Sequence, residues 1–336
     1  MKHTNNGLKW TVAVLSFTIV VGALPKPGNA QSYFSTSYLA YLLAIRYPAQ
    51  LLIRLPARDL NGIALNGAYL DDRFVTGVSL DDVSVPGRWP GETLSVDLGL
   101  NGTKFTYPMV KMVGATFTAT LDDGSLLPIR IDSVEPKWQR ADPYVIHYYV
   151  TYEGDAGARE PLCGVDENGN PVGAIPLLGS WDYSEGTETG GARIDDARVF
   201  TFACEGFVLD KCVDAGYKPW LSITVCSGWG WWRTCTEVPL DGHHQACTRM
   251  LRADYCGDGV SYTEDNILVA LYDGYGIRYD SERWGFEAEW DEDGAICANR
   301  YRVDGMEPAC FADLQDDTCG NIFHFFDGAL LFSELP

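Results

Sequence analysis

Histidines beside carboxylates are the first residues in this sequence that could carry out acid–base chemistry. His243 and His244 are adjacent, Asp241 precedes them, and Asp254 follows on the same segment. A histidine next to a carboxylate can act as a general base or hold a metal ion. His243, His244 and Asp254 are therefore the candidate catalytic residues. The alternative is a helix start at which Asp241 serves only as a capping acid.

Other signs of chemistry are scarce. The sequence has no H-E-x-x-H, G-x-S-x-G or phosphate-loop motif. His147 lies in an aromatic run and His324 stands among phenylalanines, so packing explains both better than catalysis. Asp166–Asn170 looks like a calcium loop, but Pro171 and Leu177 stand where that loop needs Gly and Glu. We predict a turn there, and no metal or cofactor.

A short aromatic loop is the second candidate site. Between Cys226 and Cys235 the chain carries three tryptophans and an arginine, namely Trp229, Trp231, Trp232 and Arg233. Large rigid rings on a braced loop suit stacking on sugar rings or insertion into a groove of a partner. The alternative is that the rings pack into the core. If they point inward, the binding hypothesis loses its main support.

The spacing of the ten cysteines favours disulfides over metal ligation. No C-x-x-C occurs, whereas clustered zinc ligands are usually about two to four residues apart. Strands expected on both sides of the aromatic loop predict a Cys226–Cys235 bond. A helix over 245–254 would hold Cys247 and Cys256 roughly 13 Å apart at 1.5 Å per residue, so this pair could bond only if the helix ended before Cys256. The predicted structural disulfides use Cys163, Cys204, Cys212, Cys226, Cys235, Cys247, Cys256, Cys297, Cys310 and Cys319.

The N-terminus predicts export. Basic residues precede the apolar run Trp10–Leu24, and Gly28-Asn29-Ala30 fits a cleavage site, so residues 1–30 read as a signal peptide cut after about Ala30. A retained anchor is the alternative, but the run is shorter than the roughly 20 residues of a membrane span. We expect a secreted, periplasmic or envelope protein with no stable membrane span after cleavage. The net charge of −21 argues against nucleic acid and anionic lipid as partners.

Residues 58–88 contain a five-residue repeat, after an N-terminal segment at 31–57. Its apolar members fall at Leu55, Leu60, Leu65, Leu70, Val75, Leu80 and Val85. This pattern resembles the pentapeptide-repeat family, whose units turn a corner every five residues to form a coil. The alternative is a set of β-hairpins with N-G and D-D turns. Either way, we expect this segment to space or display the domain that follows.

Residues 89–336 form a β-rich region, with disulfides from 163 onward. Alternating or β-branched runs predict strands at Leu94–Leu98, Ala115–Leu121, Leu126–Ile131 and Val145–Tyr152, with a turn at 122–124. The 3.6-residue periodicity over 245–254 predicts a helix. The fold class expected is mainly β with a few short helices, a β-rich α+β fold with a disulfide-braced C-terminal domain.

One stretch of this region resembles a known family. The tetrapeptide Ala253-Asp254-Tyr255-Cys256 follows His244–Met250, and Phe286–Trp290 and Gly294–Cys297 come later. Together these segments resemble the ADYC-domain family, over about residues 105–336 and most sharply over 204–310. The resemblance implies an exported bacterial protein with a cysteine-rich domain, and it implies no particular activity. From the residues alone, the tetrapeptide reads as a structural knot, in which Arg252 and Asp254 could pair.

Two functional hypotheses follow. The first is a secreted or envelope-associated, non-enzymatic binding or structural module, whose partner is a glycan or a protein at the cell surface. The aromatic loop is its distinguishing feature. The alternative is an extracellular hydrolase of polysaccharide or protein. It requires His243, His244 and Asp254 to converge within about 4 Å at one cleft.

Overall fold

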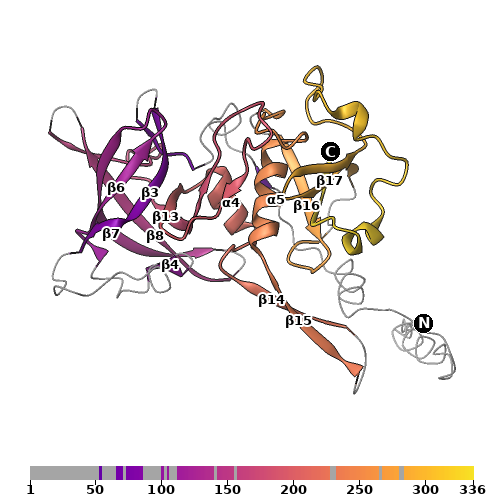
Figure 1. Cartoon of the computed structure of the whole chain (residues 1–336), viewed down its shortest axis with the longest axis horizontal. Helices are drawn as coiled ribbons and strands as arrows, with labels where there is room; N and C mark the ends of the chain where they lie inside the picture. Colours follow the sequence, from indigo (N-terminus) through magenta and orange to yellow (C-terminus); the bar gives the residue numbers. More distant parts are fainter. Residues whose placement is uncertain are drawn as a thin grey trace, which may run out of the picture. The chain divides into compact units, whose positions relative to one another are not determined.

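The structure is a computed structural model, and most of its elements are strands (Figure 1). It describes residues 53–54, 66–70, 73–85, 100–101, 104–105, 112–139, 142–154, 157–227, 232–264, 267–279 and 284–336. The predicted signal peptide and the predicted strand Leu94–Leu98 lie outside these residues. The mainly β fold class is confirmed. Among the described helices, none combines the length and the hydropathy that crossing a membrane requires.

The first sheet closes on itself. Its order is β10-β13-β3-β6-β7-β8, and β8 also pairs with β10. The strands are β3 (Arg73–Ser84), β6 (Thr116–Leu121), β7 (Leu126–Gln139), β8 (Asp142–Glu153), β10 (Ala174–Leu178) and β13 (Val199–Cys204), flanked by β2 (Tyr69–Leu70) and β9 (Arg159–Pro161). The predicted strands at 115–121, 126–131 and 145–152 are thereby confirmed. Their buried side chains, including Phe117, Tyr148 and Phe202, fill one core.

The five-residue period belongs to a bulged strand within the described residues, and the repeating coil is not observed there. Leu70, Val75, Leu80 and Val85 are all buried. In a regular strand, positions five apart point to opposite faces. The pairing of β3 with β6 shifts register twice, between Val75 and Gly77 and between Ser79 and Ser84. Such irregularities restore the inward direction of the next apolar side chain. The hairpin alternative therefore holds for β2–β3, and β3 is an integral strand of the first sheet.

The second sheet has the order β1-β16-β19-β17-β18. These strands are β1 (Ile53–Arg54), β16 (Leu268–Asp273), β17 (Gly285–Asp291), β18 (Gly294–Ala298) and β19 (Leu331–Leu335). Helix α5 (Asp241–Arg252) packs on β17, β18 and β19, and α4 (Val208–Asp214) packs on α5 and β13. Figure 1 shows both helices between the two sheets. Helix α5 was predicted over 245–254 and is observed over 241–252. Residues Gly242 to Arg252 are all buried, so the helix has no exposed face against which a 3.6-residue pattern could mark its ends.

Five disulfides join all ten cysteines. The predicted Cys226–Cys235 bond is confirmed. Cys247 and Cys256 do not pair with each other, although α5 ends at Arg252 and the condition for such a bond is met. Cys247 joins Cys212 and ties α5 to α4. The remaining bonds are Cys163–Cys204, Cys256–Cys310 and Cys297–Cys319.

Smaller elements complete the fold. Strands β14 (Ser222–Ser227) and β15 (Thr234–Pro239) form a two-stranded sheet, which we call the ribbon. Two further short pairs are β4 (Leu100–Asn101) with β5 (Lys104–Phe105), and β11 (Ser180–Trp181) with β12 (Arg193–Ile194). The 3-10 helices η3 (Phe311–Asp313) and η4 (Ile322–Phe326) precede the last strand.

Candidate functional site

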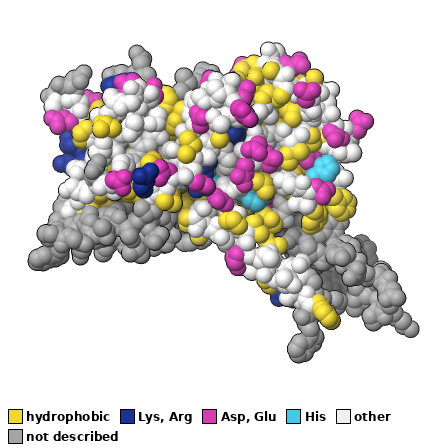
Figure 2. Space-filling view, in the orientation of Figure 1, with side chains coloured by type: hydrophobic (Ala, Val, Ile, Leu, Met, Phe, Trp, Pro, Cys, Tyr) yellow, Lys and Arg dark blue, Asp and Glu magenta, His cyan; other side chains and the backbone are white. Residues whose placement is uncertain are grey.

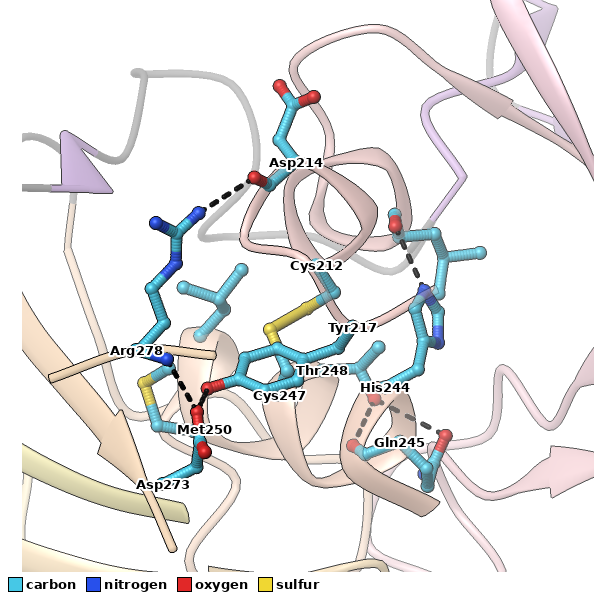
Figure 3. Close-up of a disulfide and its surroundings, with 12 residues drawn as sticks. Cys212, Asp214, Tyr217, His244, Gln245, Cys247, Thr248, Met250, Asp273 and Arg278 are labelled. Atoms are coloured by element: carbon cyan, nitrogen blue, oxygen red, sulfur yellow. Dashed lines mark hydrogen bonds between the residues drawn. A yellow bond between two sulfur atoms is a disulfide. The ribbon is translucent and has the colours of Figure 1, made fainter. Parts of the chain in front are cut away.

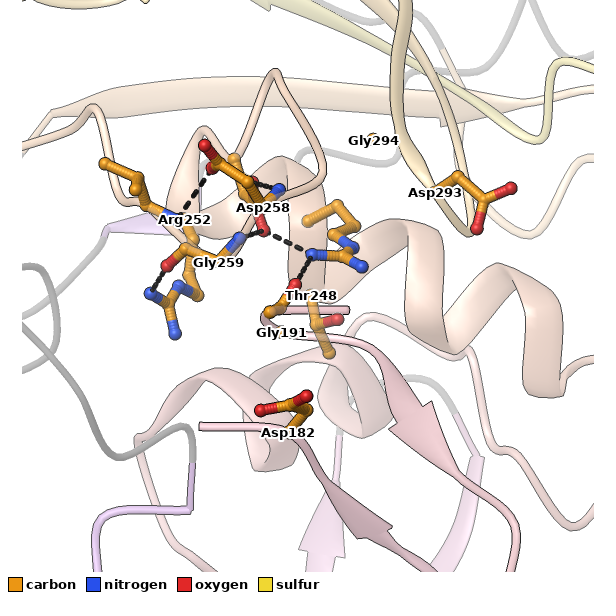
Figure 4. Close-up of polar contacts among 12 residues, drawn as sticks. Asp182, Gly191, Thr248, Arg252, Asp258, Gly259, Asp293 and Gly294 are labelled. Atoms are coloured by element: carbon orange, nitrogen blue, oxygen red, sulfur yellow. Dashed lines mark hydrogen bonds and ion pairs between the residues drawn. The ribbon is translucent and has the colours of Figure 1, made fainter. Parts of the chain in front are cut away.

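The tetrapeptide 253–256 begins where α5 ends. Ala253 has a left-handed backbone (φ 53°) and its N–H bonds to the carbonyl of Met250, so it caps the helix and reverses the chain. Asp254 then accepts hydrogen bonds from the Arg249 guanidinium (2.5 Å) and from the backbone N–H of Gly259 (3.1 Å), contacts shown in Figure 4. The carboxylate thus binds the turn that follows to the helix that precedes it.

Tyr255 anchors the same turn to the second sheet. Its hydroxyl donates to Glu287 Oε1 at 2.6 Å. Arg302 donates to both oxygens of Glu287, at 2.9 and 3.1 Å. The same guanidinium donates to the carbonyls of Met250 and Leu251, which lie in the last turn of α5. Burial and the nearby Glu287 carboxylate raise the pKa of Tyr255, so its hydroxyl stays protonated and remains a donor.

Close backbone approach completes this corner. A Cβ on Gly257 would lie 1.6 Å from the carbonyl oxygen of Asp293, and Gly257 has φ +68°. A Cβ on Gly191 would lie 2.6 Å from Arg249 Nη1. Only glycine fits at Gly257, where backbone blocks the Cβ, and a side chain at Gly191 would displace the Arg249 guanidinium. The Cys256–Cys310 disulfide then fixes the turn covalently to the segment before η3.

The two histidines lie in the first turn of α5 and face different neighbours. His244 is buried, and its Nε2 lies 3.0 Å from the carbonyl oxygen of Leu209 in α4. Figure 3 draws this contact of His244 as a dashed line. His243 stacks on the ring of Tyr217 (centroids 6.0 Å apart) and contacts Tyr275 (5.1 Å). Burial lowers the pKa of His243 to about 4 and that of His244 to about 3. Both rings are therefore neutral at pH 7.

The structure does not bring the candidate catalytic residues together. His243 and His244 lie in the first turn of α5, whereas Asp254 follows its last residue. Asp241 is the first residue of α5 and Asp254 follows its last residue, so the two carboxylates lie at opposite ends of the helix. The expected Arg252–Asp254 pair is also replaced, since Arg249 reaches Asp254. A catalytic role for the three residues stays a prediction.

Arg252 turns toward another loop. Its Nη2 donates to the carbonyl of Gly259 and lies 3.4 Å from Glu185 Oε1. The left-handed Ala253 redirects the chain, so that Asp254 faces back along α5 to Arg249, one turn before the helix end. Sequence proximity therefore suggested the wrong arginine.

Two of the four candidate residues of the aromatic loop are described, and both lie at the surface. Trp232 is 86% exposed, and Arg233 is exposed beside it. Trp229 and Trp231 lie outside the described residues. In the ribbon, Cys226 pairs with Cys235 on the opposite strand, and the two form a disulfide. Figure 1 shows the ribbon extending away from α4 and α5.

The ADYC-domain model matches residues 110–304, which is more than half of the chain and includes α5 and the tetrapeptide just described. The chain belongs to the ADYC-domain family. No curated protein and no solved structure matches it. In this ADYC domain, the four residues of the name each have a structural contact: a helix cap, an ion pair, a hydrogen bond to Glu287 and a disulfide. The name-giving motif is thus a structural corner, as its residues alone suggested.

Some buried polar groups of the ADYC domain escaped prediction. Glu289 is fully buried and its two oxygens lie 2.8 and 2.9 Å from Nδ1 of His324, so His324 makes a polar contact that the sequence did not predict. Glu289 also lies beside Cys297 and Cys319, the one group within the described residues that has metal-ligand spacing. Because these cysteines form a disulfide, they cannot ligate a metal as thiolates. No sequence pattern links positions so far apart.

Proposed function

We propose that this ADYC-domain protein is a non-enzymatic binding module, secreted or held at the cell envelope, that binds glycan through the tip of the ribbon. The observation that carries the proposal is the 86% exposure of Trp232 at the end of a disulfide-closed hairpin. A large ring left in water this completely lowers no folding free energy by burial. Its benefit is expected in a complex, where aromatic anchors contribute most.

The ribbon itself supports a binding role. Its strands pair with each other, and no other described strand joins them. Most of its side chains are exposed or half-exposed on both faces. An isolated two-stranded hairpin is at best marginally stable in water. The Cys226–Cys235 bond compensates for the missing packing and joins the two strands next to Trp232, which lowers the entropy lost on binding.

Neutral glycan fits the tip better than the other partner classes. Trp232 offers a flat apolar face for a sugar ring, and Arg233 beside it offers hydrogen-bond donors for hydroxyl groups. Figure 2 shows many Asp and Glu side chains on the visible face and few Lys and Arg. With a net charge of −21, long-range repulsion disfavours anionic surfaces and leaves neutral sugars unaffected.

Location supports the same proposal. Five disulfides fit an oxidising compartment, extracellular or periplasmic. Export through a signal peptide cut after about Ala30 is part of the proposal. It is checked by N-terminal sequencing of the mature protein, which we expect to begin at Gln31.

The test is co-sedimentation with insoluble chitin and peptidoglycan, with released sugar assayed in the supernatant. We expect pelleting without sugar release, weakened at least tenfold, or about 1.4 kcal/mol, by Trp232→Ala. Phe326→Ala is the matched control, because Phe326 is also exposed (62%) but lies in η4, outside the ribbon. Equal pelleting of wild type and Trp232→Ala, or an absence of pelleting, contradicts the proposal. Sugar release would favour the hydrolase alternative.

A further inference from the structure

A cavity of about 690 Å³ lies beside the second sheet, where β16 begins and β19 ends. This volume is within the range of about 300–1,000 Å³ that is typical of small-molecule sites. One part of the lining is apolar and consists of Ile267, Leu268, Phe311 and Leu335. The cavity is far in sequence from the ribbon and shares no residue with it.

The polar part of the lining includes a guanidinium held in place. Arg300 donates from Nη2 to the carbonyls of Gly285 (2.6 Å) and Leu335, which fixes its position at the end of β19. Within the described part of the chain, the side-chain contacts of Arg300 are to these backbone carbonyls and not to a carboxylate, and its buried Nε has no hydrogen-bond acceptor. An arginine with no carboxylate partner among the described residues is unexpected in a chain with 46 Asp and Glu against 25 Lys and Arg.

Two other charged residues, Arg302 and Asp304, line the same cavity. Arg302 also lines the cavity, but Glu287 and two carbonyls already occupy its guanidinium. Asp304 lines the cavity, is exposed, and makes no ion pair with another described residue. Among the residues that the structure describes, the cavity therefore combines a cation and an anion without ion-pair partners and an apolar wall.

The geometry points to a binding site for a short apolar peptide with both termini free. Arg300 pairs with the ligand carboxylate, a charge-assisted contact of the strong kind. Asp304 accepts from its ammonium group, and the apolar wall covers its side chains. A zwitterion suits this site better than a simple anion, because Asp304 and the net charge of −21 both repel an anion.

The test is isothermal titration of the full, disulfide-bonded chain with the dipeptide Leu-Leu, and with two blocked forms, N-acetyl-Leu-Leu and Leu-Leu-amide. We expect saturable one-to-one binding of Leu-Leu, weakened at least tenfold by either block. Asp304→Asn should bind Leu-Leu weakly and no longer distinguish it from the acetylated form. Arg300→Gln should lose the preference over the amide. Because Arg300 also braces the backbone, the blocked ligands test its role without touching the fold.

Three outcomes would overturn the inference. They are no saturable binding of Leu-Leu, equal affinity for all three ligands, and an Asp304→Asn variant that keeps its preference for the free amine. Trp232→Ala should bind Leu-Leu like the wild type. This control separates the cavity from the glycan proposal, since either can fail alone.

Discussion

The corner built by Tyr255, Glu287 and Arg302 gives the sharpest stability prediction. Tyr255→Phe removes one hydrogen bond of 2.6 Å to a buried carboxylate and leaves the ring in place. Hydrogen bonds to charged groups contribute about 1.5–3 kcal/mol, so we expect a loss of this size. Glu287→Gln leaves the Arg302 guanidinium buried without its counter-charge, and breaking a buried pair in this way costs about 3–5 kcal/mol. The free energy of unfolding is predicted to be highest for the wild type, lower for Tyr255→Phe and lowest for Glu287→Gln.

The assay is equilibrium unfolding in guanidinium chloride with disulfides intact, followed by tryptophan fluorescence. Trp290 lies 5.1 Å from the Tyr255 ring and reports on this corner. The matched control is Tyr149→Phe, because Tyr149 also donates to a glutamate, Glu135, at 2.8 Å, but at an exposed site. Exposed sites usually contribute less than about 0.5 kcal/mol. If Tyr255→Phe lost no more than Tyr149→Phe, the structural reading of the motif would be wrong.

Three further predictions follow from other contacts. Gly257→Ala should unfold the corner or lower its melting temperature sharply, because the new Cβ would lie 1.6 Å from the carbonyl of Asp293; a melting curve like that of the wild type would refute the geometry. The free energy of unfolding should fall as pH decreases from about 6.5 toward 4. In this range His243 becomes protonated in the unfolded chain but stays neutral in the folded chain, where its pKa is lowered to about 4. Denaturant unfolding of the His243→Phe variant at a series of pH values should show a smaller fall in the free energy of unfolding. The same pH dependence as in the wild type would contradict this prediction. Replacing Cys226 and Cys235 by serine should leave the unfolding midpoint almost unchanged, since the ribbon adds little to the core, yet weaken glycan pelleting, and the reverse result would count against the ribbon's role.

Local patterns predicted the local structure well. Alternation over 115–121 located β6, because one of its faces is buried and the other is not. The Cys226–Cys235 bond was also predictable, since a hairpin places its two strands opposite each other. Both inferences rest on residues that are close in sequence.

Long-range and bulged features were not predictable in the same way. The five-residue period of β3 arises from register shifts against β6, which depend on the partner strand. The Arg249–Asp254 pair depends on the left-handed Ala253, a conformation that alanine rarely adopts. Glu287 lies in β17 and Arg302 follows β18, so their contact depends on the path of the chain after β18. The cavity with Arg300 and Asp304 depends on packing between separate elements, so no motif signalled it.

The most direct test of the central claim is to observe Trp232 during binding. Indole N–H signals in a two-dimensional NMR spectrum of the labelled chain, titrated with soluble chitin and peptidoglycan fragments, report each tryptophan separately. We predict saturable shifts for the exposed Trp232 and none for the buried Trp290, whose N–H is bonded to Ser333. Saturable binding that leaves the Trp232 signal unmoved, or no binding of either fragment, would contradict the claim that the ribbon tip is the binding site.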